Sequence, residues 1–419
     1  MPLDLIDMIR TLDLRGFLYF FWYFVIFDLS RYTISLVTVA FGALMERRTH
    51  PGSYTGPVSI MLTGHNEGKN LRKSVLSLRE QTHRDSQIIV CDDGSTDDMR
   101  EQAQALKQEG IIDRYVSSGV RGGKASALNL GSFYCSHDII VSMDVDTSLD
   151  RDAIEKIILP FSDEHVGAVA GNLAIRNPFD TLMTSLQALE YFSSISIGRR
   201  FTSQLGILTI VSGAFGAFRK SALKTVGGWD VGPGDDGNIT NKLRRGGWQI
   251  KFAHKAWAMT DCPKTLPAYH RQRLRWNRSV IRYKLRKFRS VFNPFSKRFS
   301  GHDMAGIANI LFFQVFLAMS YFGYLIWLVT ELGEFAFLVI GVTIIIYFIE
   351  DLCTFVMICL LYKDKNPWPL ALYLPLYNLF DSYVVRTLRL YAYTNELIFR
   401  RSYQDTFTPT KVQNVLERF

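Results

Sequence analysis

The stretch "VSIMLTGHNEGKNLRKSVLSLREQTHRDSQIIVCDDGS", residues 58–95, decides the fold. It contains two short β-branched runs that end in polar residues, and the segment between them has the apolar spacing of a helix. A third run, "HDIIVSMDVDT" at 137–147, repeats the pattern and ends in carboxylates. Strands that alternate with helices predict an α/β fold with a parallel, doubly wound sheet, in which ligands bind beyond the carboxyl ends of the strands. We therefore expect the polar residues after all three strands to form one site.

A long apolar run precedes this soluble domain, at residues 16–45. It is long enough to cross a membrane, although Asp28 and Arg31 interrupt it. These two residues are three apart and can pair on one helix. We expect one crossing with Glu46 and the two following arginines on the cytoplasmic side. The alternative is an interfacial helix that ends near Asp28 and is followed by a shorter span.

Two further apolar runs, 305–330 and 335–362, are also long enough to span. A third run, 368–399, carries several charges, and we expect it to lie along the interface or to return to the cytoplasm. The expected organisation is an N-terminal membrane segment at 1–50, a cytosolic domain at 51–265, a basic interfacial segment at 266–303, C-terminal membrane helices at 304–399 and a cytosolic tail at 400–419.

The charge distribution sets the orientation. Residues 268–292 contain nine Lys or Arg and no Asp or Glu, and they lie just before the apolar third of the chain. Positive charge beside apolar runs indicates the cytoplasmic side of a membrane, so the net charge of +9 does not call for a nucleic acid partner. The five cysteines are odd in number and lack metal-ligand spacing, which favours a reduced compartment. We expect a multi-pass protein of the cell (inner) membrane with a cytoplasmic catalytic domain.

The strand that ends in "SMDVDT" suggests a metal site. Asp144 and Asp146 are two apart at the strand end, so we expect both side chains to face the same way. Hard carboxylates suit Mg²⁺ or Mn²⁺ that bridges the phosphates of a nucleotide. A lone D-x-D is more often an ordinary solvated turn. The motif gains weight from "CDDGSTDD" at 91–98 and "RGGKASALNLG" at 121–131.

Two glycine-rich segments add candidate residues. Gly122 and Gly123 would let the backbone approach a ligand closely, and Lys124 would begin a helix where anions already bind well. Its alternative role is that of a solvated lysine. After a Gly-Pro-Gly turn, Asp235 and Asp236 would begin another helix. A carboxylate there can act as a general base toward a sugar hydroxyl, although helix capping is the commoner use of Asp at such a position.

Together the motifs resemble a known family. They are "GHNE" at 64–67, "DDGS" at 92–95, "GGKASALN" at 122–129, "DVD" at 144–146, "SGAFGAFR" at 212–219, "GDD" at 234–236 and "QRLRW" at 272–276. Their order and spacing resemble the inverting family 2 glycosyltransferases of the processive membrane type, such as hyaluronan, chitin and cellulose synthases. The resemblance implies a GT-A fold with a mixed sheet, a nucleotide-sugar donor, a growing glycan acceptor and a divalent metal.

The resemblance also implies roles for single residues. It places His65, Glu67 and Asp93 near the uracil and ribose. Lys124 and Asp144 would lie at the diphosphate, with Asp146 the direct metal ligand, and Asp236 would be the general base. Trp276 would stack under the acceptor sugar at the mouth of a membrane channel, while Gln272 and Arg275 hold the pyrophosphate side. The remaining implied residues are Gly213, Phe215 and Asp235 with the acceptor, and Thr410 and Lys411, in "DTFTPTKVQ" at 405–413, as a gating loop.

Further expectations complete this interpretation. The other basic residues of the stretch would hold an interfacial helix against anionic headgroups; they are Arg271, Arg273, Arg278, Arg282, Lys284, Arg286, Lys287 and Arg289. The apolar runs are fewer than such synthases usually carry, so an auxiliary export subunit or a second copy could complete the channel. The expected activity is synthesis of a β-linked polysaccharide from a UDP-sugar. The alternatives are a non-processive lipid glycosyltransferase of the ceramide type and a non-enzymatic scaffold, which would have lost the acids present here.

Overall fold

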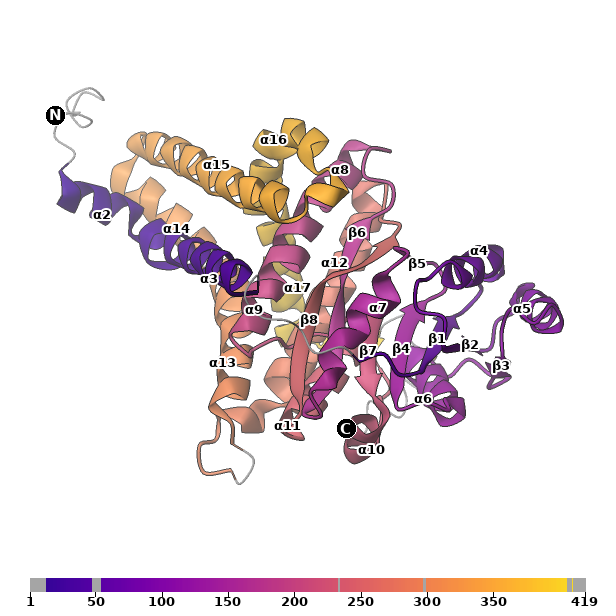
Figure 1. Ribbon diagram of the computed structural model, residues 1–419. Helices are drawn as coiled ribbons and strands as arrows, with labels where there is room; N and C mark the ends of the chain where they lie inside the picture. Colours follow the sequence, from indigo (N-terminus) through magenta and orange to yellow (C-terminus); the bar gives the residue numbers. More distant parts are fainter. Residues whose placement is uncertain (1–12, 47–53, 233, 297–298, 405–408, 410–419) are drawn as a thin grey trace.

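The computed structural model describes residues 13–46, 54–232, 234–296, 299–404 and 409. One part of the molecule is a sheet covered by helices, and the other is a group of long helices that projects away from it (Figure 1). The sheet forms the soluble domain predicted from the strand and helix pattern. The long helices come from the three apolar regions at the two ends of the sequence.

Eight strands form one mixed sheet in the order β3-β2-β1-β4-β7-β6-β8-β5. Their bounds are β1 Val58–Gly64, β2 Ser86–Asp92, β3 Arg114–Ser117, β4 Ile139–Asp144, β5 Ser148–Leu149, β6 Val166–Ile175, β7 Phe215–Arg219 and β8 Gln249–Thr260. Strands β3, β2, β1 and β4 run parallel, and β7 is antiparallel to both of its neighbours. This arrangement confirms the GT-A type of mixed α/β sheet.

Helices cover both faces of the sheet because successive strand residues, whose side chains point to opposite faces, are both apolar. Ile60 and Leu62 pack in one core with α4 and α5, whereas Met61 packs in a second core with α6. Continuous apolar strands of this kind are typical of a parallel sheet that is buried on both sides. The helices of this domain are α4 Gly68–Arg79, α5 Met99–Gln108, α6 Lys124–Tyr134, α7 Ala153–Ile158, α8 Leu182–Tyr191, α9 Gly198–Gln204, α10 Lys220–Val226 and α11 Asp235–Arg245.

Strand register brings the polar strand ends together, as the sequence predicts. Gly64 at the end of β1 pairs in register with Asp92 at the end of β2. On the other side of β1, Thr63 pairs with Asp144 at the end of β4. Because all three strands are parallel, the residues that follow them leave the sheet at one edge.

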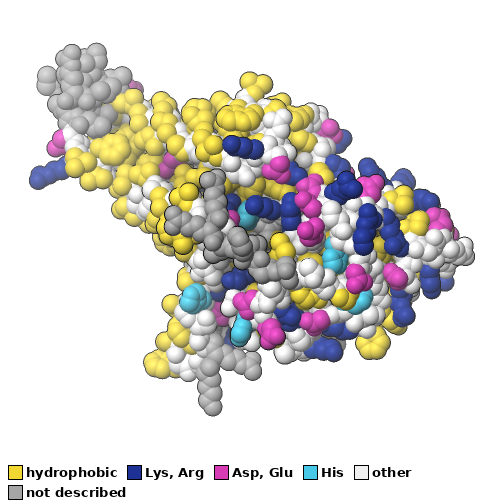
Figure 2. Space-filling view, in the orientation of Figure 1, with side chains coloured by type: hydrophobic (Ala, Val, Ile, Leu, Met, Phe, Trp, Pro, Cys, Tyr) yellow, Lys and Arg dark blue, Asp and Glu magenta, His cyan; other side chains and the backbone are white. Residues whose placement is uncertain are grey.

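Among the residues that the structure describes, three helices are long and apolar enough to cross a membrane: Leu14–Glu46, Gly301–Leu332 and Phe335–Leu361. The first comprises α2 Leu14–Tyr23, a π-helical segment Phe24–Leu29 and α3 Ser30–Glu46; the second comprises α13 Gly301–Ile310, a π-helical segment Leu311–Phe316 and α14 Leu317–Leu332; the third is α15. Apolar side chains gather over these helices, while the sheet domain presents most of the charges (Figure 2). The second helix begins earlier than expected, after Ser300, whose side chain caps it by accepting a hydrogen bond from the N–H of Asp303. Asp303 also pairs with Arg244 of the sheet domain at 2.9 Å.

The expected pairing within the first apolar run is wrong. Asp28 forms its ion pair with Arg386, at 3.1 Å, and also accepts a hydrogen bond from Tyr347. Arg31 instead lies over the ring of Phe313, at 4.8 Å from its centroid. A buried charge needs a partner, and two helices distant in sequence supply it better than the next turn of the same helix.

The last apolar run forms α16 Leu374–Leu379, a π-helical segment Phe380–Val385 and α17 Arg386–Phe399. Segment α16 contacts α8 of the sheet domain, and α17 contacts α12 (Leu266–Val280) of the basic segment. The end of α17 is held there by Glu396, which is fully buried and accepts a hydrogen bond from Arg286 at 2.5 Å.

Candidate active site

The loops after β1 and β2 meet at Asp93. Its side chain is 4% exposed and accepts hydrogen bonds from the backbone N–H groups of Gly122 and Gly123, at 2.9 and 3.0 Å. Burial raises the pKa of Asp93, and the two amides counter only part of that rise. The backbone of the glycine pair therefore approaches a carboxylate of the protein in this structure. Nδ1 of His65 lies 3.0 Å from the Asp93 carbonyl, which only accepts, so Nδ1 is the donor.

A glycine is required in "DDGS" for reasons of conformation and space. Gly94 has φ +67°, and a Cβ atom there would lie 2.5 Å from the backbone nitrogen of Arg121. The loop that carries the Gly122-Gly123 pair thus passes directly over Gly94. Asp92, the preceding acid, faces away and accepts hydrogen bonds from Tyr115 at 2.7 Å and from Ser117 at 3.2 Å.

The D-x-D segment differs from its predicted geometry. Strand β4 ends at Asp144, and Asp146 lies in the turn that follows. The alternation of a strand therefore does not orient the two carboxylates. Val145, between the two acids, packs over Gly64: a Cβ atom on Gly64 would lie 2.8 Å from Cγ2 of Val145. Asp144 forms an ion pair with Lys124.

Lys124 is the first residue of α6, as predicted, and the acids of the site lie around it. Burial alone would lower the pKa of Lys124, but the carboxylates of Asp144, Asp235 and Asp236 outweigh it and raise that pKa. Burial raises the pKa of Asp144, and the neighbouring acids add to this effect. The structure therefore brings one cation and three acids from three loops to one place.

Asp235 and Asp236 occupy the first turn of α11, directly after Gly234 with φ +80°. Tyr283 packs against this turn, since a Cβ atom at Gly234 would lie 2.8 Å from its ring. Burial and the adjacent Asp236 raise the pKa of Asp235 to about 6. With a pKa of about 6, the Asp235 carboxyl can take up and release a proton near neutral pH.

The residues present fit a hard divalent cation. The hydrogen bond that Asp146 receives, from the hydroxyl of Thr147, is long at 3.3 Å, so its carboxylate keeps lone pairs for a ligand. Within the described ranges, no group of three or more His, Cys, Asp or Glu side chains could enclose a metal ion. An open site of one or two carboxylates suits Mg²⁺ or Mn²⁺ that is completed by the phosphates of a substrate.

The "QRLRW" motif lies on α12. Trp276 is 41% exposed, and the guanidinium group of Arg273 lies 4.3 Å from the centroid of its ring. Arg273 is 5% exposed and donates a hydrogen bond to Glu190 of α8 at 2.7 Å. Gln272 contacts the same guanidinium group at 3.4 Å. The ion pair between Arg273 and Glu190 fixes how α12 is rotated, and so the direction in which Trp276 projects.

Several basic residues do not face headgroups as we expected. Arg273 is buried against Glu190, Arg286 pairs with Glu396, and Lys287 pairs with Asp230. Lys284 is 1% exposed. Arg273 and Arg286 are thus paired with acids inside the protein, which offsets the cost of their desolvation, whereas Lys287 stays exposed beside its partner. Arg271 and Arg289 are exposed, as an interfacial role requires.

The remaining predicted residues are distributed unevenly. Gly213 lies beside Lys124, and Phe215 has no exposed surface, so it packs in the core instead of lining the site. Glu67 accepts a hydrogen bond from Asn70 at 2.7 Å, at the start of α4. Thr410 and Lys411 lie outside the described residues. The preceding Pro409 is described, and its Cδ lies 3.8 Å from the place of a Cβ atom on Gly123.

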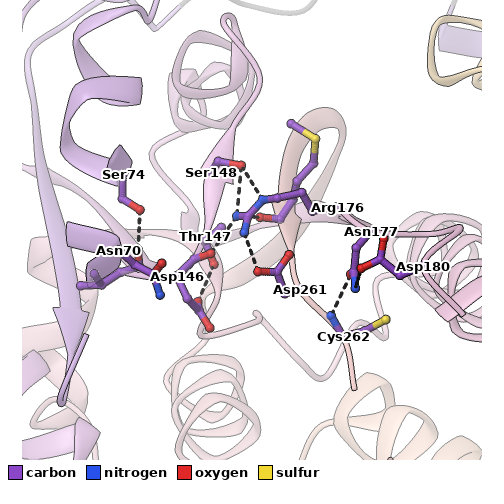
Figure 3. Close-up of polar contacts among 12 residues, drawn as sticks. Asn70, Ser74, Asp146, Thr147, Ser148, Arg176, Asn177, Asp180, Asp261 and Cys262 are labelled. Atoms are coloured by element: carbon purple, nitrogen blue, oxygen red, sulfur yellow. Dashed lines mark hydrogen bonds and ion pairs between the residues drawn. The ribbon is translucent and has the colours of Figure 1, made fainter. Parts of the chain in front are cut away.

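Two contacts of the D-x-D turn escaped the motif analysis. Ser74 of α4 donates a hydrogen bond to the carbonyl of Val145, and Arg176 donates one to the carbonyl of Asp146 at 2.7 Å (Figure 3). Neither residue belongs to a motif. Arg176 directly follows β6, and an arginine at a strand end is too common a feature to identify it from the sequence.

The sequence is similar to known glycosyltransferases. Residues 59–227 match the family model of glycosyl transferase family 2. The chain is 31% identical over 273 residues to a poly-beta-1,6-N-acetyl-D-glucosamine synthase of Staphylococcus epidermidis, over 64% of this chain and 65% of that protein. It is 30% identical over 268 residues to the synthase of Staphylococcus aureus strain COL, over 64% of each chain. The chain thus spans slightly less than two thirds of these relatives.

A solved structure supports the fold. The mannosyltransferase PcManGT from Pyrobaculum calidifontis, in complex with GDP-Man and Mn²⁺, aligns with a TM-score of 0.59 and 18% identity, over 88% of this chain and 99% of that one. This likeness concerns the fold alone. Residues 59–227, which hold the ordered motifs from "GHNE" to "SGAFGAFR", are thus similar to glycosyl transferase family 2.

Proposed function

We propose that this chain is a membrane-bound inverting glycosyltransferase that extends a β-linked polysaccharide from a nucleotide sugar, with a UDP-sugar as donor. One observation carries the proposal: Lys124, Asp144 and the Asp235-Asp236 pair converge at the carboxyl end of the parallel strands. This is where ligands bind in such sheets. The similarity to polysaccharide synthases supports a glycan product.

In the proposed reaction Asp236 accepts the proton of the acceptor hydroxyl as that oxygen attacks the anomeric carbon of the donor. Because the diphosphate leaves from the opposite face, a single displacement inverts the anomeric centre. Lys124 stabilises the negative charge that develops on the leaving diphosphate. Trp276, exposed on α12, stacks under the acceptor sugar.

Asp146, together with Asp144, would hold the divalent cation, which supplies charge neutralisation at the leaving diphosphate. The Mn²⁺ in the structure of the related fold supports a divalent ion, and either Mg²⁺ or Mn²⁺ satisfies the carboxylate donors here. His65, Glu67 and Asp93 would contact the nucleoside. Gln272 and Arg275 would contact the pyrophosphate, and Thr410 and Lys411 would close over it.

The three long helices would place the protein in the cell (inner) membrane, with the sheet domain in the cytoplasm and the glycan passing outward. Basic residues near the helix ends support this orientation. An auxiliary export subunit or a second copy of the chain would complete the path for the glycan beside the three candidate spans of the described residues.

The test is incubation of the purified chain with a panel of radiolabelled nucleotide sugars and Mg²⁺ or Mn²⁺. We expect a product of high mass from a UDP-sugar, loss of activity in excess chelator and recovery when the metal returns. A lipid that carries a single sugar would instead identify a ceramide-type enzyme. Full activity in excess chelator would contradict the metal assignment.

A further inference from the structure

The D-x-D turn is held from two sides by residues outside the motifs. Ser74 fixes the carbonyl of Val145, and Nη2 of Arg176 fixes the carbonyl of Asp146 at 2.7 Å (Figure 3). Asp146 lies beyond the last residue of β4, so the hydrogen-bond ladder of the sheet does not hold it. Backbone hydrogen bonds fix the residues on either side, from the N–H of Val145 to the carbonyl of Thr63 and from the N–H of Thr147 to the carbonyl of Asp144. The carbonyl of Asp146 itself is held by Arg176.

The other contacts of Arg176 exclude a direct role in binding phosphate. Its Nε and Nη2 contact the hydroxyl of Ser148 at 3.4 and 3.2 Å. Nη2 also donates to the carbonyl of Met259 at 2.8 Å, and Nη1 pairs with Asp261 at 3.0 Å. All three guanidinium nitrogens are thus engaged by the protein. A planar fork of this kind can hold several acceptors in fixed directions, which the single ammonium group of a lysine cannot.

Arg176 also connects the turn to the chain that leads into α12. Its backbone N–H donates to the carbonyl of Thr260 at 3.0 Å. Next to it, Asn177 accepts a hydrogen bond from the backbone N–H of Cys262 at 3.3 Å (Figure 3). Asp180 pairs with Lys264 at 2.5 Å. Residues 176–180 and 260–264 are therefore joined along their length, directly before the helix that carries Trp276.

We propose that Arg176 is a positioning residue for the divalent-cation site: it fixes the backbone of Asp146 and ties the D-x-D turn to the segment before α12. This inference rests on the proposed function, because it assumes that Asp146 binds the cation. Partners that orient a metal ligand typically change metal affinity by roughly 10- to 100-fold when removed. Arg176 acts on the ligand through its backbone, so we expect a loss near the lower end, about tenfold.

The experiment measures Mn²⁺ binding by the full chain in detergent, from the electron paramagnetic resonance signal of free Mn²⁺, with UDP at saturation. The test variants are Arg176→Lys and Asp261→Asn. Asp261 is 62% exposed, so Asp261→Asn is compatible with folding and removes one anchor of the guanidinium group. The matched control is Arg219→Lys. Arg219 likewise donates to several carbonyls and pairs with an acid, Asp138, but it lies at the opposite end of β4.

Arg176→Lys should lower Mn²⁺ affinity about tenfold, and Asp261→Asn should lower it less. UDP binding in chelator should stay unchanged in both, and excess Mn²⁺ should restore turnover. Arg219→Lys should bind Mn²⁺ as the wild type does. Unchanged affinity in Arg176→Lys, or an equal loss in Arg219→Lys, would overturn the inference. If the wild type took up no Mn²⁺ with UDP, the donor and metal of the proposed function would fail, which is a separate result.

Discussion

The side chain of Lys124 crosses the α-carbon of Gly213, so that a Cβ atom on Gly213 would lie 2.7 Å from the ammonium nitrogen. The same ammonium group pairs with Asp144 at the end of β4. Gly213 therefore provides the space in which a lysine from a helix start reaches an acid at a strand end. Its place in "SGAFGAFR" is explained by this crossing, without a contact to the acceptor.

Replacement of Gly213 by alanine should displace Lys124 from Asp144 while the fold is kept, because a flexible side chain can move where backbone cannot. A hydrogen bond to a charged group contributes about 1.5–3 kcal/mol, so nucleotide binding should weaken roughly tenfold or more. The measurement is titration of the purified variant with UDP. Gly301→Ala is the matched control, since nothing lies within 4 Å of a Cβ there. Equal binding by the two variants would contradict the prediction.

Asp236→Asn should abolish turnover and leave donor binding intact, since Lys124 and the metal site hold the diphosphate independently of the base. Single-turnover assays together with UDP titration separate the two effects. Asp235→Asn is the natural comparison, because it alters the neighbouring acid on the same helical turn. Near wild-type turnover in Asp236→Asn, with an inactive Asp235→Asn, would show that the general base had been assigned to the wrong acid.

The turnover number should fall as the pH drops below about 6. Burial and the adjacent Asp236 raise the pKa of Asp235 to about 6, so this carboxyl takes up a proton there while ordinary carboxylates remain ionised. A proton bound to Asp235 or Asp236 opposes the use of this pair as the general base. The check is the pH profile of turnover at saturating donor. In Asp235→Asn this limb should move to lower pH, and an unchanged limb would assign it to another group.

Loss of the Glu190–Arg273 pair should destabilise the protein. Both groups are largely buried, and removal of one partner of such a pair costs about 3–5 kcal/mol because the other charge is left unpaired. Glu190→Gln should therefore lower the unfolding temperature in detergent and weaken acceptor use. Arg72→Gln is the control, since its pair with Glu109 is exposed and should contribute little. Similar unfolding temperatures for the two variants would argue against a structural role for the buried pair.

Cysteine labelling tests the topology. In a variant without native cysteines, a cysteine at Phe295, which is highly exposed before α13, should react with an impermeant reagent only after lysis. A cysteine at Glu334, in the turn between α14 and α15, should react in intact cells. The reason is that basic residues near the other ends of these helices hold those ends in the cytoplasm. Labelling of position 295 in intact cells would reverse the orientation.

Local patterns predicted the strands β1, β2 and β4 and the starts of α6 and α11 correctly. Their signals lie within a few residues: apolar runs that end in polar turns, and glycines just before a helix. The mixed character of the sheet came from the family resemblance. No local pattern indicated β3, which has four residues, because so short a run is not distinguished from a loop.

The sequence by itself determined which chemical groups lie at the strand ends, because side-chain period and turn chemistry are properties of neighbouring residues. Only the tertiary structure decided which charges meet. Arg273 pairs with Glu190, which lies 83 positions away in the sequence, and Asp28 pairs with Arg386, which lies 358 positions away. A buried charge pairs with whichever opposite charge the packing of helices and strands brings to it, since desolvation without a partner is costly. For the same reason the contact of Arg176 with the D-x-D turn became visible only in the folded chain.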